Sequence, residues 1–421
     1  MLSAGFIRNN VELVKERLSI KNFKEINLVD SIIVLDDERK QLQFKIDENQ
    51  AKLNLVSKEI GMLMAKGEKK TAEEKKQEVA VLKESIQPLS LKLGEVEKQL
   101  LGEIILLPNL PHSSVPKGKT PEENEIAREG GAIPQLPNSA VPHWDLAKKY
   151  DLINFELGNK ITGSGFPVYK GAGAKLQRAL IQYFLDFNTN SGYTEYQPPL
   201  MVNEASAYGT GQLPDKEGQM YFATADNFYL IPTSEVPLTN IYRDEIIKDL
   251  PIKMTAYTPC FRREAGSYGK DVRGLNRLHQ FDKVEIVQLA DPEKSYEILE
   301  DMVKHVERLL QSLELPYRIL RLCGGDMSFT SALTYDFEVY SAAQQKWLEV
   351  SSCSNFETFQ ANRMKIRYRD ESGKTQLVHT LNGSSLALPR IVACLLENNQ
   401  TESGIKLPKA IQPYFGKEMI D

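Results

Sequence analysis

The sequence predicts an α+β fold in which a helical arm precedes a larger domain built on an antiparallel sheet flanked by helices. Three patterns carry this prediction: heptad runs between about residues 30 and 101, a stretch rich in proline and glycine at 107–142, and an irregular mixture of helical and strand-like runs from residue 143 onward. The 421 residues suffice for two domains. We expect an N-terminal domain at 1–106, a linker at 107–142 and a second domain at 143–421.

The heptad runs predict an antiparallel two-helix coiled coil. The polar segment AKGEKKT, Ala65–Thr71, separates the runs, and Gly67 is a natural turn residue. The apolar seam residues are Leu35, Leu42, Ile46, Leu53, Val56, Ile60 and Leu63 in the first run, and Val79, Leu82, Ile86, Leu89, Leu93, Val96 and Leu100 in the second.

Three residues depart from the heptad pattern. Arg39 and Asn49 occupy seam positions where apolar side chains are expected. A buried Asn can fix the register of two helices at some cost in stability. Pro88 lies inside the second run and removes a backbone donor, which predicts a local kink.

The second domain shows no regular strand–helix–strand rhythm. Helical stretches at 174–187 and 292–313 are mixed with strand-like runs at 283–289, 334–340 and 347–351. Such a mixture favours an antiparallel sheet over a parallel one.

Composition limits the possible functions. The formal net charge is −5, so any nucleic-acid contact must use local basic patches. The cysteines are scattered and form no C-x-x-C pair, which predicts free thiols and no zinc site; they are Cys260, Cys323, Cys353 and Cys394. The N-terminus lacks the apolar core of a signal peptide, and no apolar run is long enough to span a bilayer. We therefore expect a cytoplasmic protein without a membrane partner.

Two familiar nucleotide loops are excluded. GKT occurs at 118–120 and at 373–375, but a phosphate loop needs a glycine five residues before each GKT glycine, where Ser113 and Tyr368 stand. GAGAKL at 171–176 lacks the third glycine of a dinucleotide loop. If ATP is used, it is bound by another kind of site.

Two segments in the first half of the second domain have both a structural and a functional interpretation. GYTEYQPPLMVN, Gly192–Asn203, follows a helix expected to end near Phe187, and its structural interpretation is a helix, a turn and an edge strand closed by Pro198 and Pro199. In IPTSEVPLTN, Ile231–Asn240, the side chains of Thr233 and Glu235 form an acceptor-rich corner that could hold an ammonium group. The same residues are also good helix-start chemistry before Pro237.

A third segment, CFRREAGSYGKDVRGLNRLHQFDKVEIV at Cys260–Val287, is more specific. The stretch FRREAGSYG, Phe261–Gly269, runs into a charged, glycine-rich loop, and the chain returns through HQF into an alternating strand. A hairpin with arginine on one strand and an aromatic ring on the other suits a nucleotide, because the guanidinium fork matches a phosphate or carboxylate bidentately. The alternative is a solvated basic hairpin.

The fourth signal is a pair of segments near the C-terminus, WLEVSSCSNFETFQANR (347–363) and LNGSSLALPRIVACLLEN (381–398). The first offers the side chains of Glu349 and Ser352, although Glu349 could equally be a plain polar strand residue. In the second, residues 382–384 are expected to form a tight turn before a helix whose first turn contains Pro389. Cys394 on that helix is expected to pack in the core.

Together these segments resemble class II aminoacyl-tRNA synthetases, and in detail the seryl branch, over nearly the whole chain. The fourth pair departs from the general class II motif 3, with fewer glycines and no acidic residue before Arg390, but this form is typical of the seryl branch. The resemblance implies an ATP-dependent ligase that attaches serine to tRNA(Ser) through a seryl-adenylate, releasing pyrophosphate and AMP. It implies the same for a selenocysteine tRNA if one is present, and a homodimer formed through the 192–203 region.

The resemblance also assigns site residues. The serine site comprises Thr233, Ser234, Glu235, Arg262, Glu285, Asn382 and Ser384. The ATP site comprises Arg262, Arg263, Glu264, Phe281, Glu349, Val350, Ser351, Ser352 and Arg390. Glu349 and Ser352 would hold Mg²⁺ with ATP, since oxygen donors suit that ion. Arg262, Glu349 and Arg390 are expected to be catalytic.

Within these sets, Arg262 would bridge the serine carboxylate and the ATP α-phosphate. Phe281 would stack on adenine, Glu285 would face the serine side chain, and Arg390 would point at the γ-phosphate. Arg263 should point to the opposite face if its segment is a strand, so it has no chemistry of its own. None of the five histidines is a convincing general base.

The arm would contact the long variable arm of the tRNA. Basic residues gather near its tip among glutamates, namely Lys66, Lys69, Lys70, Lys75 and Lys76. By itself such a pattern is also typical of a solvated helical hairpin. RNA of this kind is recognised through backbone and shape, with strong salt dependence.

Two other classes of function are weighed against the ligase. A synthetase-like protein that only binds RNA should have lost Arg262, Glu349 or Arg390, and all three are present. A ligase that charges a carrier protein should lack the arm, and the heptad runs count against it.

Overall fold

The computed structural model describes residues 1–215, 217–264 and 273–421, and it divides into two compact units. The arm unit comprises Met1–Ser19 and Phe23–Pro108, and the sheet unit comprises Ile20–Asn22 and Asn109–Asp421. Residues 265–269 of the FRREAGSYG stretch lie outside the described residues. In the described part of the chain, no helix has both the length and the apolar character needed to cross a membrane.

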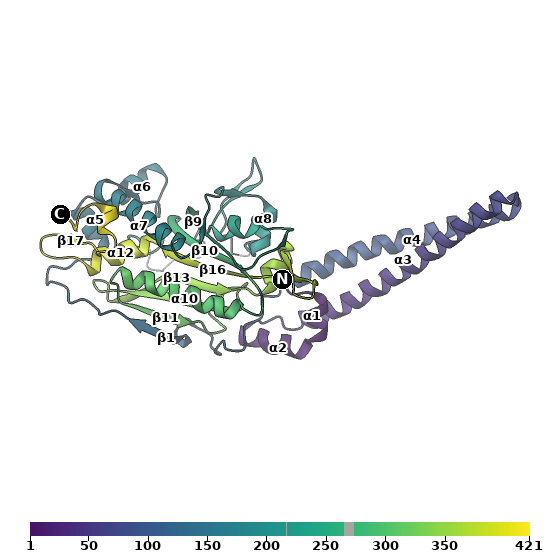
Figure 1. Cartoon of the computed structure of the whole chain (residues 1–421), viewed down its shortest axis with the longest axis horizontal. Coiled ribbons are helices and arrows are strands. Elements are labelled where there is room, and N and C mark those ends of the chain that lie inside the picture. Colours follow the sequence, from purple (N-terminus) through teal and green to yellow (C-terminus); the bar gives the residue numbers. More distant parts are fainter. Residues whose placement is uncertain (216, 265–272) are drawn as a thin grey trace. The chain divides into compact units, whose positions relative to one another are not determined.

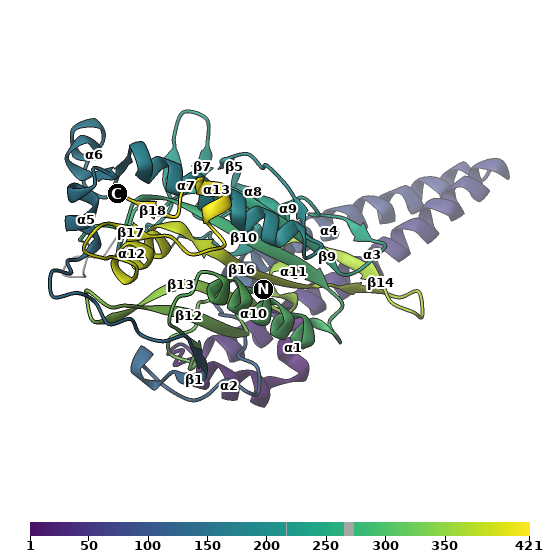
Figure 2. The same cartoon turned by 60° about the vertical axis from the view of Figure 1, so that its left-hand side comes forward.

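The sheet unit is built on eight strands in the order β1-β11-β12-β13-β16-β10-β9-β4 (Figures 1 and 2). Neighbouring strands are antiparallel, except for the parallel pair β4 and β9. In sheet order, the strands are β1 (Glu125–Gly130), β11 (Tyr317–Arg321), β12 (Leu333–Ser341), β13 (Lys346–Asn355), β16 (His379–Ala387), β10 (Gln280–Ala290), β9 (Ile252–Phe261) and β4 (Thr194–Glu195).

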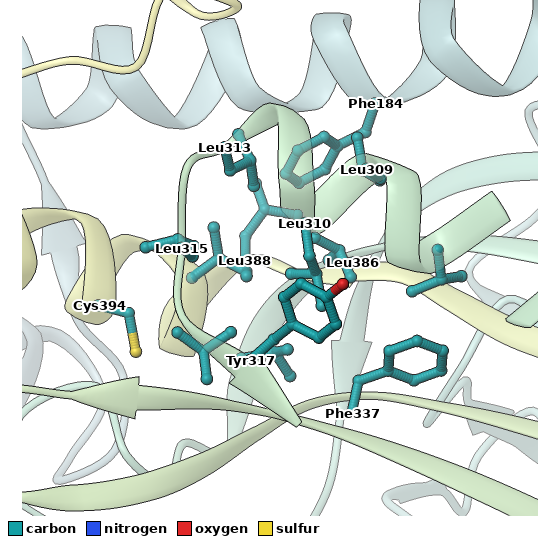
Figure 3. Packing of buried hydrophobic residues seen from close by; sticks show 14 of the residues in the cluster. Phe184, Leu309, Leu310, Leu313, Leu315, Tyr317, Phe337, Leu386, Leu388 and Cys394 are labelled. Carbon is teal, nitrogen blue, oxygen red and sulfur yellow. The ribbon is translucent and has the colours of Figure 1, made fainter. Parts of the chain in front are cut away.

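The long helices α7 (Gly171–Thr189), α10 (Ser295–Ser312) and α12 (Leu388–Asn398) pack against this sheet. Their apolar sides and one face of the strands form the main core, where Phe184 of α7, Leu309 of α10 and Phe337 of β12 are fully buried (Figure 3). Cys394 of α12 belongs to the same core, as predicted, and all four cysteines are free and buried. Burial of this kind is the main favourable contribution to folding.

Short elements complete the sheet unit. The helical ones are η1 (Pro121–Glu123), α5 (His143–Lys149), α6 (Phe155–Ile161), α8 (Glu204–Thr210), α9 (Glu235–Asn240), α11 (Thr358–Met364) and α13 (Gln412–Phe415). The strands are β2 (Ile153–Asn154), β3 (Val168–Tyr169), β5 (Met201–Val202), β6 (Phe222–Ala223), β7 (Phe228–Leu230), β8 (Ile246–Ile247), β14 (Arg367–Arg369), β15 (Thr375–Leu377), β17 (Ile405–Lys406) and β18 (Met419–Ile420).

The predicted fold class is confirmed, with two local differences. The stretch 107–142, expected to be a linker, contributes β1 to the edge of the sheet. Residues 382–384, expected to form a tight turn, instead lie inside β16 and pair with β10 and β13. The glycine there serves a close approach of strands, because a Cβ at Gly383 would lie 2.6 Å from the sulfur of Cys353.

The arm unit consists of α1 (Ala4–Asn9), α2 (Val11–Ile20) and the hairpin of α3 (Leu28–Ala65) and α4 (Lys69–Ile104), which lie along each other in Figure 1. The heptad residues of both runs are buried or half-buried, as the seam predicts. The turn is shorter than expected, at 66–68 around Gly67, because Ala72 is already fully buried and helical packing extends almost to the tip.

Asn49, a polar residue at a seam position, has a hydrogen-bond partner on the facing helix. The Asn49 amide donates to the Ser85 hydroxyl across the hairpin at 3.4 Å, and that hydroxyl donates to the Leu82 carbonyl at 2.7 Å. Helix α4 continues through Pro88. A polar contact that only one register can make favours that register over its neighbours.

A buried carboxylate ties α1 to α3. Asp36 is 1% exposed and accepts from Arg8 at 2.7 Å, from Arg39 at 2.8 Å and from Lys40 at 3.0 Å. Burial alone would raise the pKa of Asp36, but hydrogen bonds from these three cations outweigh it and hold the pKa at about 2. Arg39 therefore serves an ion-pair cluster rather than the apolar seam.

Replacing Asp36 by Asn should destabilise the arm unit by about 2 kcal/mol near neutral pH, because it leaves the cations without their shared anion. The pKa of Asp36 lies below its ordinary value of 3.8, so its contribution is present above pH 4 and is lost as the pH falls towards 2. The difference between the two proteins should shrink over that window.

Urea unfolding followed by two probes tests this expectation. Both tryptophans, Trp144 and Trp347, lie in the sheet unit, whereas far-ultraviolet circular dichroism reports all helices. Asp36→Asn should shift the circular dichroism transition to lower urea and leave the fluorescence transition in place. Exposed Asp47→Asn on α3 is the matched control, and equal shifts of the two probes would contradict the local role of Asp36.

Candidate active site

A cavity of about 610 Å³ opens among β10, β13, β16, the end of β9 and the start of α12. It collects nearly all the site residues predicted from the sequence. Those that line it are Thr233, Glu235, Arg262, Glu264, Phe281, Glu285, Glu349, Val350, Ser351, Ser352, Asn382, Ser384 and Arg390. Two predicted residues in the described part of the chain do not: Ser234 is fully buried beside Thr258, and Arg263 is exposed.

Strand alternation explains why these residues share one wall. Phe281, Lys283 and Glu285 lie at every second position of β10 and line the cavity, while Val284 and Ile286, which follow Lys283 and Glu285, enter the main core. The cavity residues of β10 therefore lie on the face of the sheet opposite to the main core.

A β-bulge in β13 places the side chains of Glu349 and Ser352 on the same side of the sheet. In the pairing of β12 with β13, Phe337 faces Ser351 but the next residue, Glu338, faces Glu349, so β13 carries one extra residue. In a regular strand, Glu349 and Ser352 would point to opposite faces, since they are three positions apart. The bulge lets both line the cavity.

These oxygens fit a hard divalent cation. Carboxylate and hydroxyl oxygens are the donors that Mg²⁺ prefers. Asp336 lies opposite Ser352 in the β12–β13 ladder, and its Oδ1 is buried without a hydrogen-bond partner among the described residues. Burial, together with the nearby Glu349 carboxylate, raises the pKa of Asp336.

A second group of charges forms a buried polar corner. The Lys283 ammonium lies 2.5 Å from Glu285 and donates to the Thr233 hydroxyl at 2.8 Å. Burial raises the pKa of Glu285, and Lys283 opposes that effect. Glu235 accepts from the Gln360 amide at 2.6 Å. Sequence reasoning missed Lys283 and Gln360, although strand alternation from Glu285 could have identified Lys283.

Arg262 and Phe281 form the aromatic side of the cavity. The Arg262 guanidinium lies 5.2 Å from the centre of the Phe281 ring, and its Nε donates to the Pro232 carbonyl at 3.4 Å. The Arg262 backbone amide donates to the carbonyl of His279, and the His279 ring contacts the Arg262 carbonyl oxygen at 3.1 Å. His279 therefore shapes this hairpin.

The opposite end of the cavity carries two further arginine contacts. Arg390, the third residue of α12, donates through Nε to the Asn276 carbonyl at 3.1 Å and through Nη1 to the Glu349 carbonyl at 2.7 Å. Glu264 forms an ion pair with Arg277. Asn276 and Arg277 also line the cavity and were missed by sequence reasoning, because nothing in their local pattern indicates a long-range contact.

The arm lysines belong to the other unit and are not equivalent to one another. Lys75 lies 2.9 Å from Glu78 and 3.3 Å from Glu59, and Lys76 lies 2.9 Å from Glu73. The other three lysines near the turn, Lys66, Lys69 and Lys70, are exposed.

Replacing Glu235 by Gln should stabilise the sheet unit above pH 7. Burial raises the pKa of Glu235 to about 7, against an ordinary 4.5. Between these values the unfolded chain loses the proton while the folded chain keeps it, so stability falls as the pH rises through that window. The neutral amide avoids this loss and can still accept from Gln360. The free energy of unfolding should therefore increase by about 3 kcal/mol at pH 8.

Thermal unfolding of the ligand-free proteins at pH 4.5 and pH 8, followed by tryptophan fluorescence, measures this gain. Glu235→Gln should raise Tm at pH 8 only, and exposed Glu293→Gln should change it at neither pH. An increase of the same size at both pH values would show that ionisation of Glu235 is not its cause.

Comparisons with known proteins agree with this geometry. The model described as tRNA synthetase class II core domain (G, H, P, S and T) matches residues 221–399, and the model of the seryl-tRNA synthetase N-terminal domain matches residues 1–111. The serine–tRNA ligase of Salinibacter ruber is 50% identical, over 99% of this chain and 98% of that protein. The serine–tRNA ligase of Methylacidiphilum infernorum is 47% identical over the full length of both.

Solved structures give the same result. The seryl-tRNA synthetase from Pyrococcus horikoshii, crystallised with ATP, superposes with a TM-score of 0.93 at 33% identity, over 100% of this chain and 99% of that one. The cytoplasmic serine–tRNA ligase of Naegleria fowleri, solved with AMP, gives 0.88 at 25% identity. With full-length relatives close to half identical and both domains matched, this chain belongs to the seryl-tRNA synthetase family of class II aminoacyl-tRNA synthetases.

Proposed function

We propose that this chain activates serine with ATP and transfers the seryl group to tRNA(Ser), and to a selenocysteine tRNA where one is present. The observation that carries the proposal is the cavity itself. It gathers a guanidinium, a buried acidic corner and an oxygen-donor pair on one wall. These are the groups needed to hold an amino acid beside a nucleoside triphosphate.

In the first step, a serine carboxylate oxygen attacks the α-phosphorus of ATP. A new carboxyl–phosphate bond forms and the bond to pyrophosphate breaks. No protein nucleophile is required, so catalysis rests on positioning and charge stabilisation. Arg262 would hold the carboxylate and the α-phosphate together, with Phe281 against the adenine. The guanidinium already lies over that ring.

Arg390, Glu349 and Ser352 would contact the phosphate end of ATP. Arg390 is held towards the cavity by two backbone carbonyls, which fits contact with the γ-phosphate. Glu349 and Ser352 would hold Mg²⁺, which would offset phosphate charge when bound. In the second step, a ribose hydroxyl of the tRNA attacks the seryl carbonyl carbon and AMP leaves.

Selection of serine would depend on the buried acidic corner. Thr233 and Glu235 would receive the ammonium group, and Glu285 would pair with the hydroxyl. Alanine would leave Glu285 unpaired, and sites that bond a substrate hydroxyl can reject such an analogue by about 10⁴-fold. Lys283 contacts both Thr233 and Glu285, so it keeps their oxygens paired while serine is absent.

Two assembly features belong to the same proposal. The arm would contact the long variable arm of the tRNA, with Lys66, Lys69 and Lys70 as exposed cations near the tip. A homodimer would form through the 192–203 region, where Pro199, Leu200 and Met201 are exposed beside the edge strand β4. Exposed apolar residues beside a sheet edge are typical of an interface.

Serine-dependent ATP–pyrophosphate exchange tests the activation step. Serine should support exchange, whereas alanine, glycine and threonine should not. Arg262→Lys should lower kcat/KM by about 10²-fold, because a lysine keeps the charge but loses the bidentate fork. Arg178→Lys, at an exposed position of α7 outside the cavity lining, should leave exchange unchanged. No exchange with any amino acid would refute the proposed reaction.

A shortened arm tests the tRNA role. Removing residues 43–88 and joining the helices by a short glycine–serine turn keeps Asp36 with its cations and the Glu38–Lys92 pair at the base. This variant should keep serine-dependent exchange within about twofold, because the cavity lies wholly in the sheet unit. It should lose most tRNA charging. Normal charging would show that the arm does not hold the tRNA.

A further inference from the structure

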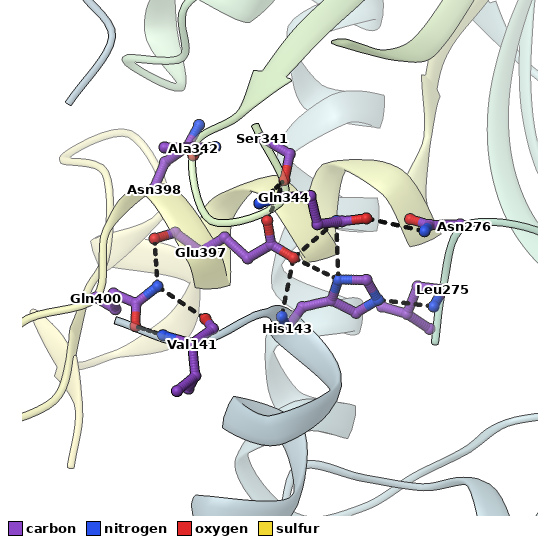
Figure 4. A network of polar contacts seen from close by, with 10 residues as sticks. All are labelled: Val141, His143, Leu275, Asn276, Ser341, Ala342, Gln344, Glu397, Asn398 and Gln400. Carbon is purple, nitrogen blue, oxygen red and sulfur yellow. Dashed lines mark hydrogen bonds and ion pairs between the residues drawn. The ribbon is translucent and has the colours of Figure 1, made fainter. Parts of the chain in front are cut away.

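A fully buried histidine–glutamate pair lies outside the set of predicted site residues (Figure 4). His143 is the first residue of α5, Glu397 lies near the end of α12, and both side chains are completely buried. One carboxylate oxygen, Oε1, accepts from the His143 backbone amide at 2.9 Å, contacts ring Nδ1 at 2.6 Å and accepts from the Gln344 amide at 2.8 Å. The other oxygen accepts from the Ser341 hydroxyl.

The pair fixes the state of the imidazole ring. Because Nδ1 lies against a carboxylate oxygen, the ring proton is placed on Nδ1. The other nitrogen, Nε2, is then an acceptor, and the Leu275 backbone amide donates to it at 2.8 Å. Glu397 thus orients an acceptor towards the Leu275 amide, in the Cys260–Val287 segment.

Neighbouring contacts hold the same short segment. The Arg273 guanidinium lies 4.4 Å from the centre of a Trp144 ring. At Gly274, φ is +65°, and an added Cβ would lie 2.2 Å from Nε2 of His143, so only glycine allows the approach. The Asn276 amide donates to Gln344 at 3.0 Å.

The segment held in this way reaches the cavity directly. Leu275, Asn276 and Arg277 all line it. The Asn276 carbonyl accepts from Arg390, and Arg277 pairs with Glu264. A displacement of residues 275–277 would therefore move Arg277 and Arg390. The acidic corner is held by different contacts, those of Lys283 with Thr233 and Glu285.

We propose that His143 and Glu397 are positioning residues for the ATP end of the cavity. They act through the amide of Leu275, which sets the place of the Asn276 carbonyl and hence of Arg390. The inference rests on the proposed function. A buried ion pair is by itself weak evidence for stability, and an apolar pair of the same volume could fill the space. What an apolar pair cannot supply is an acceptor for the Leu275 amide.

Two substitutions of His143 separate the contacts. Asn places an amide donor near the position of Nδ1, so it can keep the bond to Glu397 while leaving the Leu275 amide unpaired. Gln extends an oxygen towards the position of Nε2, so it can accept from that amide. In pyrophosphate exchange, His143→Asn should raise KM for ATP roughly tenfold and leave KM for serine within about twofold. His143→Gln should stay within about twofold of the unmodified chain for both.

Gly274→Ala disturbs the same contact, because its added Cβ would crowd Nε2 of His143. This variant tests the positioning role if His143→Asn fails to fold. It should show the same rise in KM for ATP with KM for serine unchanged. If both folded variants bind ATP normally, or if KM for serine rises as much as KM for ATP, the positioning role is refuted. Absence of serine-dependent exchange in the unmodified chain would instead refute the proposed function, which keeps the two failures distinct.

Discussion

The site depends on the two faces of the central sheet. Strands β10, β13 and β16 belong to one antiparallel array, and alternate residues of β10 point to the packed helices and to the cavity. The core behind the wall is close-packed, so it holds the backbone from which the cavity residues project. A slip of one residue in β10 would exchange Lys283 and Glu285 for Val284 and Ile286, placing charges in the core. Packing and function therefore select the same register.

Buried carboxylates are a second determinant of this cavity, beside the alternation of side chains along β10. Glu235 and Glu285 are almost fully buried, and burial raises the pKa of each. An isolated buried carboxylate would be costly, so each has a close partner, Gln360 for one and Lys283 for the other. Stability given up at such a site is typical of residues kept for binding rather than for folding.

Much of this was predictable from the sequence where the signal is local. Heptads located α3 and α4, and resemblance located Arg262 and Phe281 on facing sides of a hairpin. Prediction failed where the determinant is a pairing partner far along the chain. Residues 382–384 read as a turn because Asn, Gly and Ser favour turns, yet strand pairing with β10 and β13 overrides that preference. The role of His143 depends on Leu275, which sequence spacing does not connect to it.

Strand β1 has a consequence for how the sheet is completed. Arg321 of β11 meets Glu125 of β1, 196 residues earlier in the chain. Until that pairing forms, β11 presents a row of open backbone donors and acceptors, and such an edge can recruit a strand from another molecule. Once in place, β1 moves the open edge to a short strand with Glu125, Arg128 and Glu129, whose charges discourage further pairing. The proline-rich stretch thus covers an edge that would otherwise favour aggregation. It does so by pairing an early part of the chain, β1, with a late part, β11.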